Sequence, residues 1–393
     1  METQPATLSW TENGQACTAL WRSERATPAP RRVVLADDTL SADAAYKLAC
    51  EGTALLWRGD FQNARQLLQA LARRAERPAQ RGSKKGKPPG AAPSPAAAFH
   101  SYRQAQSQRA RVLGMVLIGL DADYAIPLRR APDWRVACIE AWGAPDAEAA
   151  ASVVSLREML GLVSAHEWRK KGVEVPALGE PPQNRIHPHY GVFSPVRGEY
   201  VALAAKAPLP VHSAMVQAFD IGTGTGVLAA VLARRGLRHV VATDQDPRAL
   251  ACARENLERL GVAEQVEVLQ ADLFPPGKAS LVVCNPPWLP ARAGSPIEHA
   301  VYDEGSRMLL GFLNGLAAHL APGGEGWLIL SDIAEHLGLR SRAELLAAID
   351  AAGLKVLGRL DTRPQHPKAA DPSDPLHGAR AKEVTSLWRL AVA

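Results

Sequence analysis

The chain has 393 residues, of which 47% are hydrophobic and 22% charged, and its formal net charge is +5 at pH 7. This composition excludes a wholly disordered, collagenous or fibrous protein, and the length predicts two domains. The longest apolar stretch, residues 112–120, is much shorter than the roughly 20 residues that cross a bilayer. No basic segment followed by an apolar run opens the chain, so we expect no secretory signal and no membrane partner.

The cysteines and histidines do not form the pattern of a metal site. The five cysteines are dispersed without a CxxC pair, which is typical of a reducing compartment rather than of a disulfide framework or a zinc site. His187 and His189 stand close together, but no third ligand lies within sequence reach. We therefore expect a cytoplasmic protein without a bound metal.

Positive charge is concentrated in residues 65–111. This stretch has a single acid, Glu76, and eleven basic residues, namely Arg65, Arg73, Arg74, Arg77, Arg81, Lys84, Lys85, Lys87, Arg103, Arg109 and Arg111. It carries a charge of +10, and the rest of the chain carries −5. Such a segment can bind a nucleic-acid backbone, because neutralised phosphates release condensed counterions. A solvated surface that aids solubility is the alternative.

The first half of the chain is mixed, mainly helical, and carries no chemical motif. In residues 1–77, Asp60 is placed to cap a helix. That helix is indicated by apolar residues at helical spacing, namely Phe61, Ala64, Leu67, Leu68 and Leu71. Residues 78–98 are rich in Lys, Pro, Gly and Ala and predict a flexible basic loop, because they cannot bury an apolar face.

Residues 99–185 complete the first half. Residues 112–120 predict a strand, and residues 147–162 predict an amphipathic helix. Residues 172–189 are rich in Pro and Gly and predict a domain boundary.

In residues 190–393 the pattern changes to alternating strands and helices. Strands are predicted at residues 214–221, 239–243, 266–270, 281–284, 327–330 and 384–390. Helices are predicted at residues 227–235 and after Asp246, where Pro247 takes the first helical position. Such repeats imply an α/β domain with a mainly parallel twisted sheet and helices on both faces. Ligands bind at the carboxyl ends of the strands in sheets of this kind.

The first of these strands ends in a glycine-rich turn, Asp-Ile-Gly-Thr-Gly-Thr-Gly at residues 220–226. Glycines at alternate positions, namely Gly222, Gly224 and Gly226, allow a ligand to approach the backbone closely. The dinucleotide fingerprint requires glycine where this chain has Val227, and the P-loop requires a lysine that is missing here. The turn, including Thr223, therefore suits a nucleoside without a pyrophosphate, and S-adenosylmethionine is the candidate cofactor.

Three acids at successive strand ends support this cofactor. Asp220 lies beside the position of its charged aminoacyl end. Asp244 ends the second strand, where a carboxylate can accept hydrogen bonds from both ribose hydroxyls. Asp272 follows the third strand and can accept a hydrogen bond from the adenine amine. For Asp244, initiation of a turn is the alternative.

The fourth strand leads into Asn285, Pro286, Pro287 and Trp288. An exocyclic amine or a carboxamide nitrogen is a poor nucleophile, because its lone pair is delocalised. The Asn285 side-chain oxygen and the Pro286 carbonyl can accept both N–H bonds and hold the nitrogen in line with a methyl group. The prolines stiffen the turn, and Trp288 offers a flat face on which a base or an amide can stack.

Together these residues resemble the class I S-adenosylmethionine-dependent methyltransferases that modify planar nitrogens. Those enzymes carry a D-x-G-x-G-x-G loop, acids after strands two and three, and an (N/D)PP(F/Y/W) motif, all of which are matched here. The resemblance covers about residues 190–393 and points to the small-domain group, similar to rRNA base and release-factor glutamine methyltransferases. It implies a Rossmann-like fold, S-adenosylmethionine as methyl donor, and an extra N-terminal domain for substrate recognition.

We expect the substrate to be an exocyclic amine of a base in RNA, above all ribosomal RNA, bound through residues 65–111. Bases in folded RNA are recognised where they are splayed out and stacked, which suits Trp288. The first alternative is a protein glutamine side chain, although enzymes of that group usually have tyrosine where this chain has Trp288. The second alternative is a non-catalytic nucleic-acid-binding protein on the same fold.

Three further segments bear on the site. Residues 190–195 resemble the segment that these enzymes place over the cofactor, and core packing of Phe193 is the alternative. Residues 300–305 either line the substrate pocket or open a helix. Residues 364–382 are polar and proline-rich and form a candidate substrate-binding loop.

Overall fold

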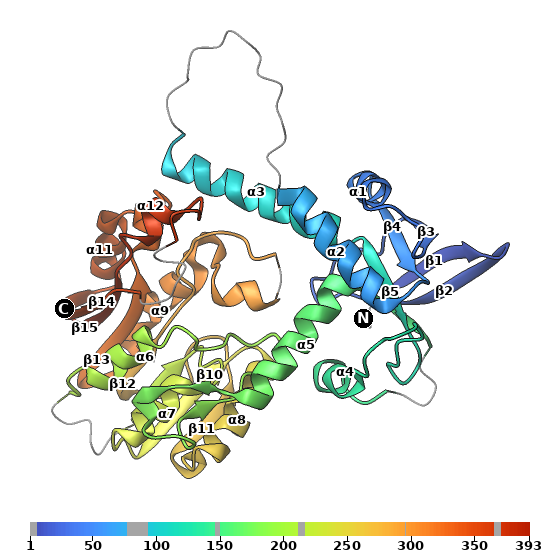
Figure 1. Ribbon diagram of the computed structural model, residues 1–393. Coiled ribbons are helices and arrows are strands. Elements are labelled where there is room, and N and C mark those ends of the chain that lie inside the picture. The colour runs from blue at the N-terminus through green and yellow to red at the C-terminus, as the bar shows by residue number, and fades with distance from the viewer. Residues whose placement is uncertain (1–5, 77–92, 146–149, 211–216, 295, 365–370) are drawn as a thin grey trace, which may run out of the picture. The chain divides into compact units, whose positions relative to one another are not determined.

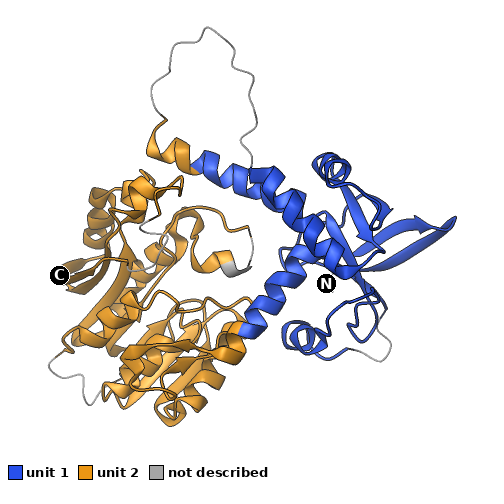
Figure 2. Ribbon diagram, viewed as in Figure 1, with its two compact units in different colours: residues 1–92, 100–167 blue, residues 93–99, 168–393 orange. Residues whose placement is uncertain are grey.

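The computed structural model describes residues 6–76, 93–145, 150–210, 217–294, 296–364 and 371–393 (Figure 1). The chain divides into two compact units, unit 1 of residues 1–92 and 100–167 and unit 2 of residues 93–99 and 168–393 (Figure 2). Two helices, α3 (Pro95–Leu113) and α5 (Leu156–Lys171), contribute residues to both units. The predicted domain limits, 1–77, 78–98, 99–185 and 190–393, remain predictions.

Unit 1 is built around a six-stranded sheet in the order β1-β2-β6-β5-β4-β3. Its strands are β1 (Thr7–Glu12), β2 (Gln15–Arg22), β3 (Arg32–Ala36), β4 (Thr53–Trp57), β5 (Val116–Leu120) and β6 (Ser152–Ser155). Its remaining helices are α1 (Ala42–Cys50), α2 (Phe61–Glu76) and α4 (Arg135–Trp142). The sequence indicated one strand here, so a mainly helical description missed the sheet that organises this unit.

Two predicted elements of unit 1 were wrong in part. The strand predicted at residues 112–120 begins only at Val116, because the preceding residues complete α3. The helix predicted at residues 147–162 begins only at Leu156, after the short strand β6. All four residues of β6 are buried between β2 and β5, an environment that suits its two β-branched valines.

The predicted helix after Asp60 is confirmed as α2. The Asp60 Oδ1 atom accepts a hydrogen bond of 2.9 Å from the Gln62 N–H, as expected of an N-cap. Of the predicted loop at residues 78–98, residues 78–92 lie outside the described part of the chain, and Pro95 already begins α3.

Unit 2 contains a seven-stranded sheet in the order β11-β10-β9-β12-β13-β15-β14. Its strands are β9 (Gln217–Ile221), β10 (His239–Asp244), β11 (Val266–Gln270), β12 (Ala279–Cys284), β13 (Leu320–Ser331), β14 (Leu354–Thr362) and β15 (Thr385–Val392). The first five of these pair in parallel, and β15 runs antiparallel to β13 and β14. The predicted α/β fold with a mainly parallel sheet is confirmed.

Helices cover both faces of this sheet. The α-helices that follow α5 are α6 (Glu199–Lys206), α7 (Val227–Arg234), α8 (Pro247–Arg259), α9 (Arg307–His319), α10 (Ile333–His336), α11 (Arg342–Ala351) and α12 (His377–Arg380). A small sheet of β7 (Val173–Glu174) and β8 (Arg185–Ile186) precedes them. Among the described helices, none is long and apolar enough to cross a bilayer.

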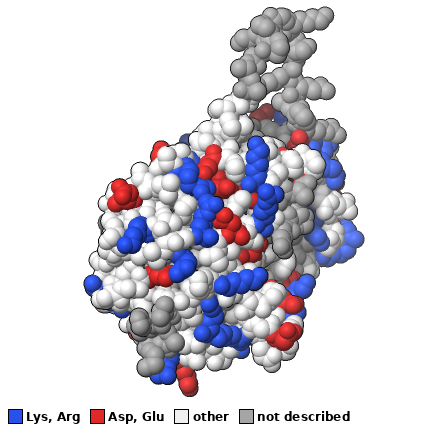
Figure 3. Space-filling model, turned by 90° about the vertical axis from the view of Figure 1, so that its left-hand side faces the viewer, with Lys and Arg blue, Asp and Glu red and all other residues white. Residues whose placement is uncertain are grey.

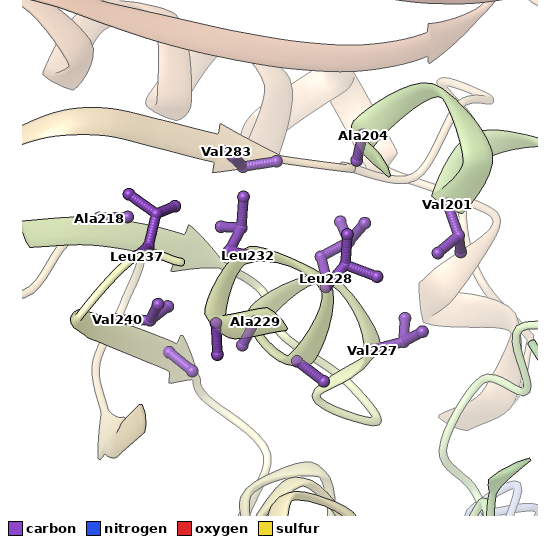
Figure 4. Packing of buried hydrophobic residues seen from close by; sticks show 14 of the residues in the cluster. Val201, Ala204, Ala218, Val227, Leu228, Ala229, Leu232, Leu237, Val240 and Val283 are labelled. Atoms are coloured by element: carbon purple, nitrogen blue, oxygen red, sulfur yellow. The ribbon is translucent and has the colours of Figure 1, made fainter. Parts of the chain in front are cut away.

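Alternate residues of the strands supply two separate cores. Ala218, Val240 and Val283 pack with α6, α7 and α8, whereas Phe219 and Val282 pack with α9 and α11. Every residue of α7 from Val227 to Ala233 is buried, as expected of a helix that is apolar on all sides. Figure 4 shows side chains of α7 directed at the neighbouring strands. The close packing of this helix fixes the glycine-rich turn that precedes it.

Candidate functional site

The parallel register brings the predicted site residues to one edge of the sheet. Asp220 of β9 is level with Ala242 of β10 on one side and with Val283 of β12 on the other. The carboxyl ends of these strands therefore emerge side by side, which is where ligands bind in sheets of this kind. The pairing of these strands thus brings the predicted turn, its acids and Asn285 close together.

The glycine-rich turn has a backbone that side chains would strain. Gly222, Gly224 and Gly226 have φ angles of 71°, 56° and 81°, in the left-handed region that favours glycine. A Cβ on Gly226 would also lie 3.2 Å from the Cα of Ala253, so α8 packs directly against the turn. The Thr223 N–H donates to the Thr243 carbonyl at 2.8 Å and joins the turn to β10. The turn therefore presents bare backbone at its three glycines, and the Met308 side chain lies against Gly222.

Asp220 is a buried acid with one unused oxygen. Its Oδ2 atom accepts hydrogen bonds from Thr223 Oγ1 at 2.7 Å and from the Ala229 N–H at 3.0 Å. Its Oδ1 atom is buried without a hydrogen-bond partner, which is rare for a carboxylate oxygen. Burial raises the pKa of this carboxyl to about 6. A cationic ligand group at Oδ1 would satisfy the oxygen and favour its ionised form.

Asp244 ends β10 and faces the turn. Its Oδ2 atom accepts from the Gly224 N–H, and its Oδ1 atom accepts from the Asp246 N–H, both at 3.0 Å. Burial raises the pKa of this carboxyl also. Each oxygen keeps acceptor capacity, so the carboxylate is held in place and can still bind ribose hydroxyls. Asp246 caps α8 as predicted, by accepting from the Arg248 N–H.

Asp272 lies next to Asp244, but it is exposed. The backbone N–H of the preceding residue, Ala271, donates to the Asp244 carbonyl at 3.1 Å. The Asp272 side chain is 59% exposed and accepts from Gln245 Nε2 at 2.6 Å and from Arg307 Nη2 at 2.7 Å. An adenine amine would therefore share this carboxylate with two protein donors.

The turn after β12 presents Asn285 next to the glycine-rich turn. Cys284 pairs with Ile221, so the next residue on each strand, Asn285 and Gly222, leaves the sheet at the same level. The Trp288 Nε1–H donates to Asn285 Oδ1 at 2.9 Å, which leaves the oxygen a second lone pair. The Arg197 guanidinium lies over the Trp288 ring at 5.8 Å from its centroid. A stacked base would therefore share this ring with Arg197.

Sequence reasoning missed two further buried oxygens in unit 2. Glu199 Oε1 and Ser194 Oγ are buried without a hydrogen-bond partner. Glu199 begins α6, and both it and Asp220 act electrostatically on the buried Tyr200 hydroxyl, whose pKa is raised first by burial and then by these charges. An acid in the first turn of a helix is expected to interact favourably with the helix dipole, so no sequence signal indicates an unsatisfied oxygen here.

The other segments singled out in the sequence have structural partners. Within residues 190–195, Val192 packs against Ala249 and Cys252 of α8, and Phe193 is half-buried. The segment 300–305 both pairs with Leu289, beside the Asn285 turn, and supplies Asp303 to the start of α9. In residues 364–382, residues 365–370 lie outside the described chain and α12 occupies part of the remainder.

The predicted histidine pair and the basic segment can be placed in part. His187 Nδ1 contacts the Arg169 carbonyl, and His189 Nε2 contacts Glu255, both at 2.6 Å. No group of three metal-ligating side chains occurs in the described residues. In the basic segment, Arg74 pairs with Asp43 and Arg109 pairs with Glu76. Five of its eleven basic residues lie outside the described chain, namely Arg77, Arg81, Lys84, Lys85 and Lys87.

Part of unit 2 is similar in sequence to known proteins. Residues 183–342 match the family described as "Methyltransferase small domain". The "Release factor glutamine methyltransferase" of Cereibacter sphaeroides is 34% identical over 171 residues, which are 39% of this chain and 60% of that protein. The "Ribosomal protein L11 methyltransferase" of Pelotomaculum thermopropionicum is 40% identical over 144 residues, 36% of this chain and 39% of that protein. The methyltransferase resemblance drawn from the sequence is thus confirmed for this domain.

One solved structure is also similar, but its sequence identity is lower than that of these two relatives. The "ribosomal protein L11 methylase" of Lactobacillus delbrueckii subsp. bulgaricus has a TM-score of 0.35 and 18% identity, and covers 50% of this chain and 79% of that chain. The chain spans 60% and 39% of the lengths of these two relatives, less than two thirds in each case. What those proteins act on therefore bears on this chain only as a proposal.

Proposed function

We propose that this protein transfers a methyl group from S-adenosylmethionine to a planar nitrogen, since residues 183–342 match the methyltransferase small domain. The observation that carries the proposal is the juxtaposition of Asn285 with the rigid glycine-rich turn and the unused Asp220 oxygen. A cofactor with a cationic aminoacyl end and a ribose matches the acids at Asp220 and Asp244. The turn residues Gly222, Thr223, Gly224 and Gly226 complete the cofactor site, with Asp272 at the adenine.

S-adenosylmethionine supplies an electrophilic methyl group on a sulfonium centre. The chain's own residues bind and orient the nucleophile. The second lone pair of Asn285 Oδ1 and the Pro286 carbonyl accept the two N–H bonds, which draws the nitrogen lone pair out of conjugation. Pro287 stiffens the turn and Trp288 holds the Asn285 amide, so these acceptors are oriented before the substrate arrives. The proton can leave after transfer, so no strong general base is needed.

The test of this reaction is Asn285→Ala. We expect methyl transfer to fall by at least roughly 100-fold, because a preorganised acceptor at the reacting nitrogen is lost. Cofactor affinity, measured by calorimetry, should stay within about twofold, because Asp220, Asp244 and the turn are unchanged. A variant that still transfers methyl at the original rate would exclude the mechanism. Asn256→Ala would not serve as a matched control for Asn285→Ala. The buried Asn256 side chain donates a hydrogen bond to the backbone of the glycine-rich turn, so its loss would disturb the turn itself.

For the substrate we propose an exocyclic amine of a base in RNA, above all ribosomal RNA. The +10 charge of residues 65–111 supports this class, since basic segments supply the phosphate contacts of RNA-binding proteins. The experiment is transfer of radiolabelled methyl into an extract of cells that lack the gene, followed by digestion. Label released by ribonuclease and retained on proteolysis is the expected result.

The relatives favour a second candidate, the side-chain nitrogen of a protein glutamine. A matching relative is named "Release factor glutamine methyltransferase", and a carboxamide nitrogen presents the same two N–H groups to Asn285. Trp288, in the place where such enzymes usually have tyrosine, counts against this candidate. Label released only by proteolysis would establish it, and residues 65–111 would then be a solvated surface.

A further inference from the structure

Within unit 2, a series of contacts leads from Asn285 to a carboxylate outside the sequence motifs. Trp288 Nε1–H donates to Asn285 Oδ1 at 2.9 Å, and the Arg197 guanidinium covers the same indole at 5.8 Å. Arg197 Nη1 donates in turn to Glu383 Oε1 at 3.2 Å. Three chain segments, separated by up to 186 residues, thus meet behind the Asn285 amide.

Glu383 is firmly held. Its side chain is only 2% exposed, against 23% for Arg197, and Ser331 Oγ donates to the same Oε1 atom at 2.8 Å. Ser331 ends β13 and pairs with Thr385, which begins β15, so both strands fix the carboxylate at the edge of the sheet where Asn285 emerges. A buried carboxylate requires such partners, because an unpaired charge at this depth is costly.

We infer that Arg197 and Glu383 are positioning residues for the methyl transfer, and that they act through Trp288 on the orientation of the Asn285 amide. The inference rests on the proposed function. An indole N–H is only a donor, so its bond requires the oxygen of the amide and fixes which end of Asn285 faces Trp288. The flat guanidinium, attracted to the indole face, limits rotation of the ring. The Glu383 carboxylate holds the guanidinium there.

The test uses Arg197→Lys and Glu383→Gln, with Trp288→Phe to assign the indole signal. Lysine keeps the charge of Arg197 but loses the planar contact, and glutamine removes the Glu383 charge at nearly constant volume. The matched control is Arg359→Lys, since Arg359 lies over Trp388 at 5.0 Å, an equivalent contact that involves no site residue. For each full-length variant, the Trp288 indole ¹⁵N–¹H resonance, cofactor affinity and methyl transfer into the extract are measured.

We expect Arg197→Lys and Glu383→Gln to shift the Trp288 resonance and to lower the transfer rate at saturating cofactor roughly 10- to 100-fold. Cofactor affinity should stay within about twofold, and the Arg359→Lys control should change neither quantity. A general loss of fold would weaken cofactor binding as well, so this combination separates positioning from stability. If Glu383→Gln folds poorly, the inference is tested by Arg197→Lys alone, because Arg197 is the more exposed of the two residues.

Two results would overturn the inference. An unchanged Trp288 resonance in Arg197→Lys removes the link between the arginine and the indole, whatever the activity. A shifted resonance with an unchanged transfer rate removes the positioning role. Failure of the proposed function has a different signature, because Asn285→Ala would then retain transfer while the resonance shifts persist.

Discussion

The two oxygens of Asp220 lie in different environments, and this difference points to a ligand. Oδ2 is bonded within the turn, whereas Oδ1 is equally buried and has no partner. Glu199 supplies a second buried oxygen of this kind, and both acids act on Tyr200. Since buried acceptors nearly always have donors, a cationic group of the proposed cofactor at Asp220 Oδ1 would satisfy that oxygen.

Cofactor affinity should therefore depend on pH through Asp220. Its pKa of about 6 in the folded protein means that the carboxyl is neutral below that pH and ionised above it. A ligand ammonium group binds the ionised form, so affinity is constant above pH 6 and falls by about tenfold per pH unit below it. Calorimetry with S-adenosylmethionine between pH 5 and 7.5 measures this. Asp220→Asn should bind more weakly and without the slope; a slope that survives in this variant would assign the titration elsewhere.

The candidate site residues that can be predicted from the sequence are those with local signals. The turn glycines, the acids at strand ends and Asn285 were identified because each stands at a fixed offset from a strand. Arg197 and Glu383 have no such offset, since their meeting depends on two distant segments reaching one sheet edge. Glu199 was recognised only from the structure, because its buried Oε1 atom has no hydrogen-bond donor. No sequence pattern predicts such an atom.

At the scale of elements, Asp303 belongs to the start of α9. Its carboxylate accepts from the Met308 N–H at 2.9 and 3.1 Å and from the Leu309 N–H at 3.2 Å, and the residue is buried. These donors have no partner inside the helix, so the acid satisfies them and complements the helix dipole. Of the two roles open for residues 300–305, the helix entry thus has direct support.

Replacing Asp303 should therefore loosen α9 locally. We expect Asp303→Ala to cost about 1 kcal/mol, within the usual range for a lost cap, and to speed hydrogen exchange at Met308 and Leu309 by about fivefold. Asp303→Asn keeps an acceptor and should cost less. Asp350→Ala, at an exposed aspartate of α11, is the control. Unchanged exchange together with lost methyl transfer would instead place Asp303 in substrate binding.

The elements of the two units differed in how well the sequence predicted them. In unit 2, α8 was delimited by its Asp246 cap and Pro247, both of which act within a few residues. In unit 1, the four residues of β6 carry no such marks, and the strand exists because Leu20, 132 residues before Ser152, pairs beside it. The β6 segment forms a strand because it is buried between two neighbouring strands, although its local sequence favoured a helix.

At the scale of the whole molecule, charge is the property that bears on the substrate. Figure 3 shows one face on which Lys and Arg are interspersed with Asp and Glu. Part of the positive charge of residues 65–111 is likewise compensated, since Arg74 and Arg109 pair with acids. Within the stretch, residues 81–87 hold four basic residues and no acid, so they carry the most concentrated charge.

If RNA is the substrate, these four charges should set the salt dependence of binding. We expect replacement of Arg81, Lys84, Lys85 and Lys87 by Gln to lower the slope of log affinity against log salt by about 3, at roughly 0.7 for each lost contact with single-stranded RNA. Filter binding to purified ribosomal RNA between 50 and 300 mM salt measures the slope. Because chain length is kept and these residues lie outside the methyltransferase small domain, cofactor affinity should not change. An unchanged slope would assign the segment to solubility and leave the glutamine candidate favoured, since a peptide substrate has no phosphates to neutralise.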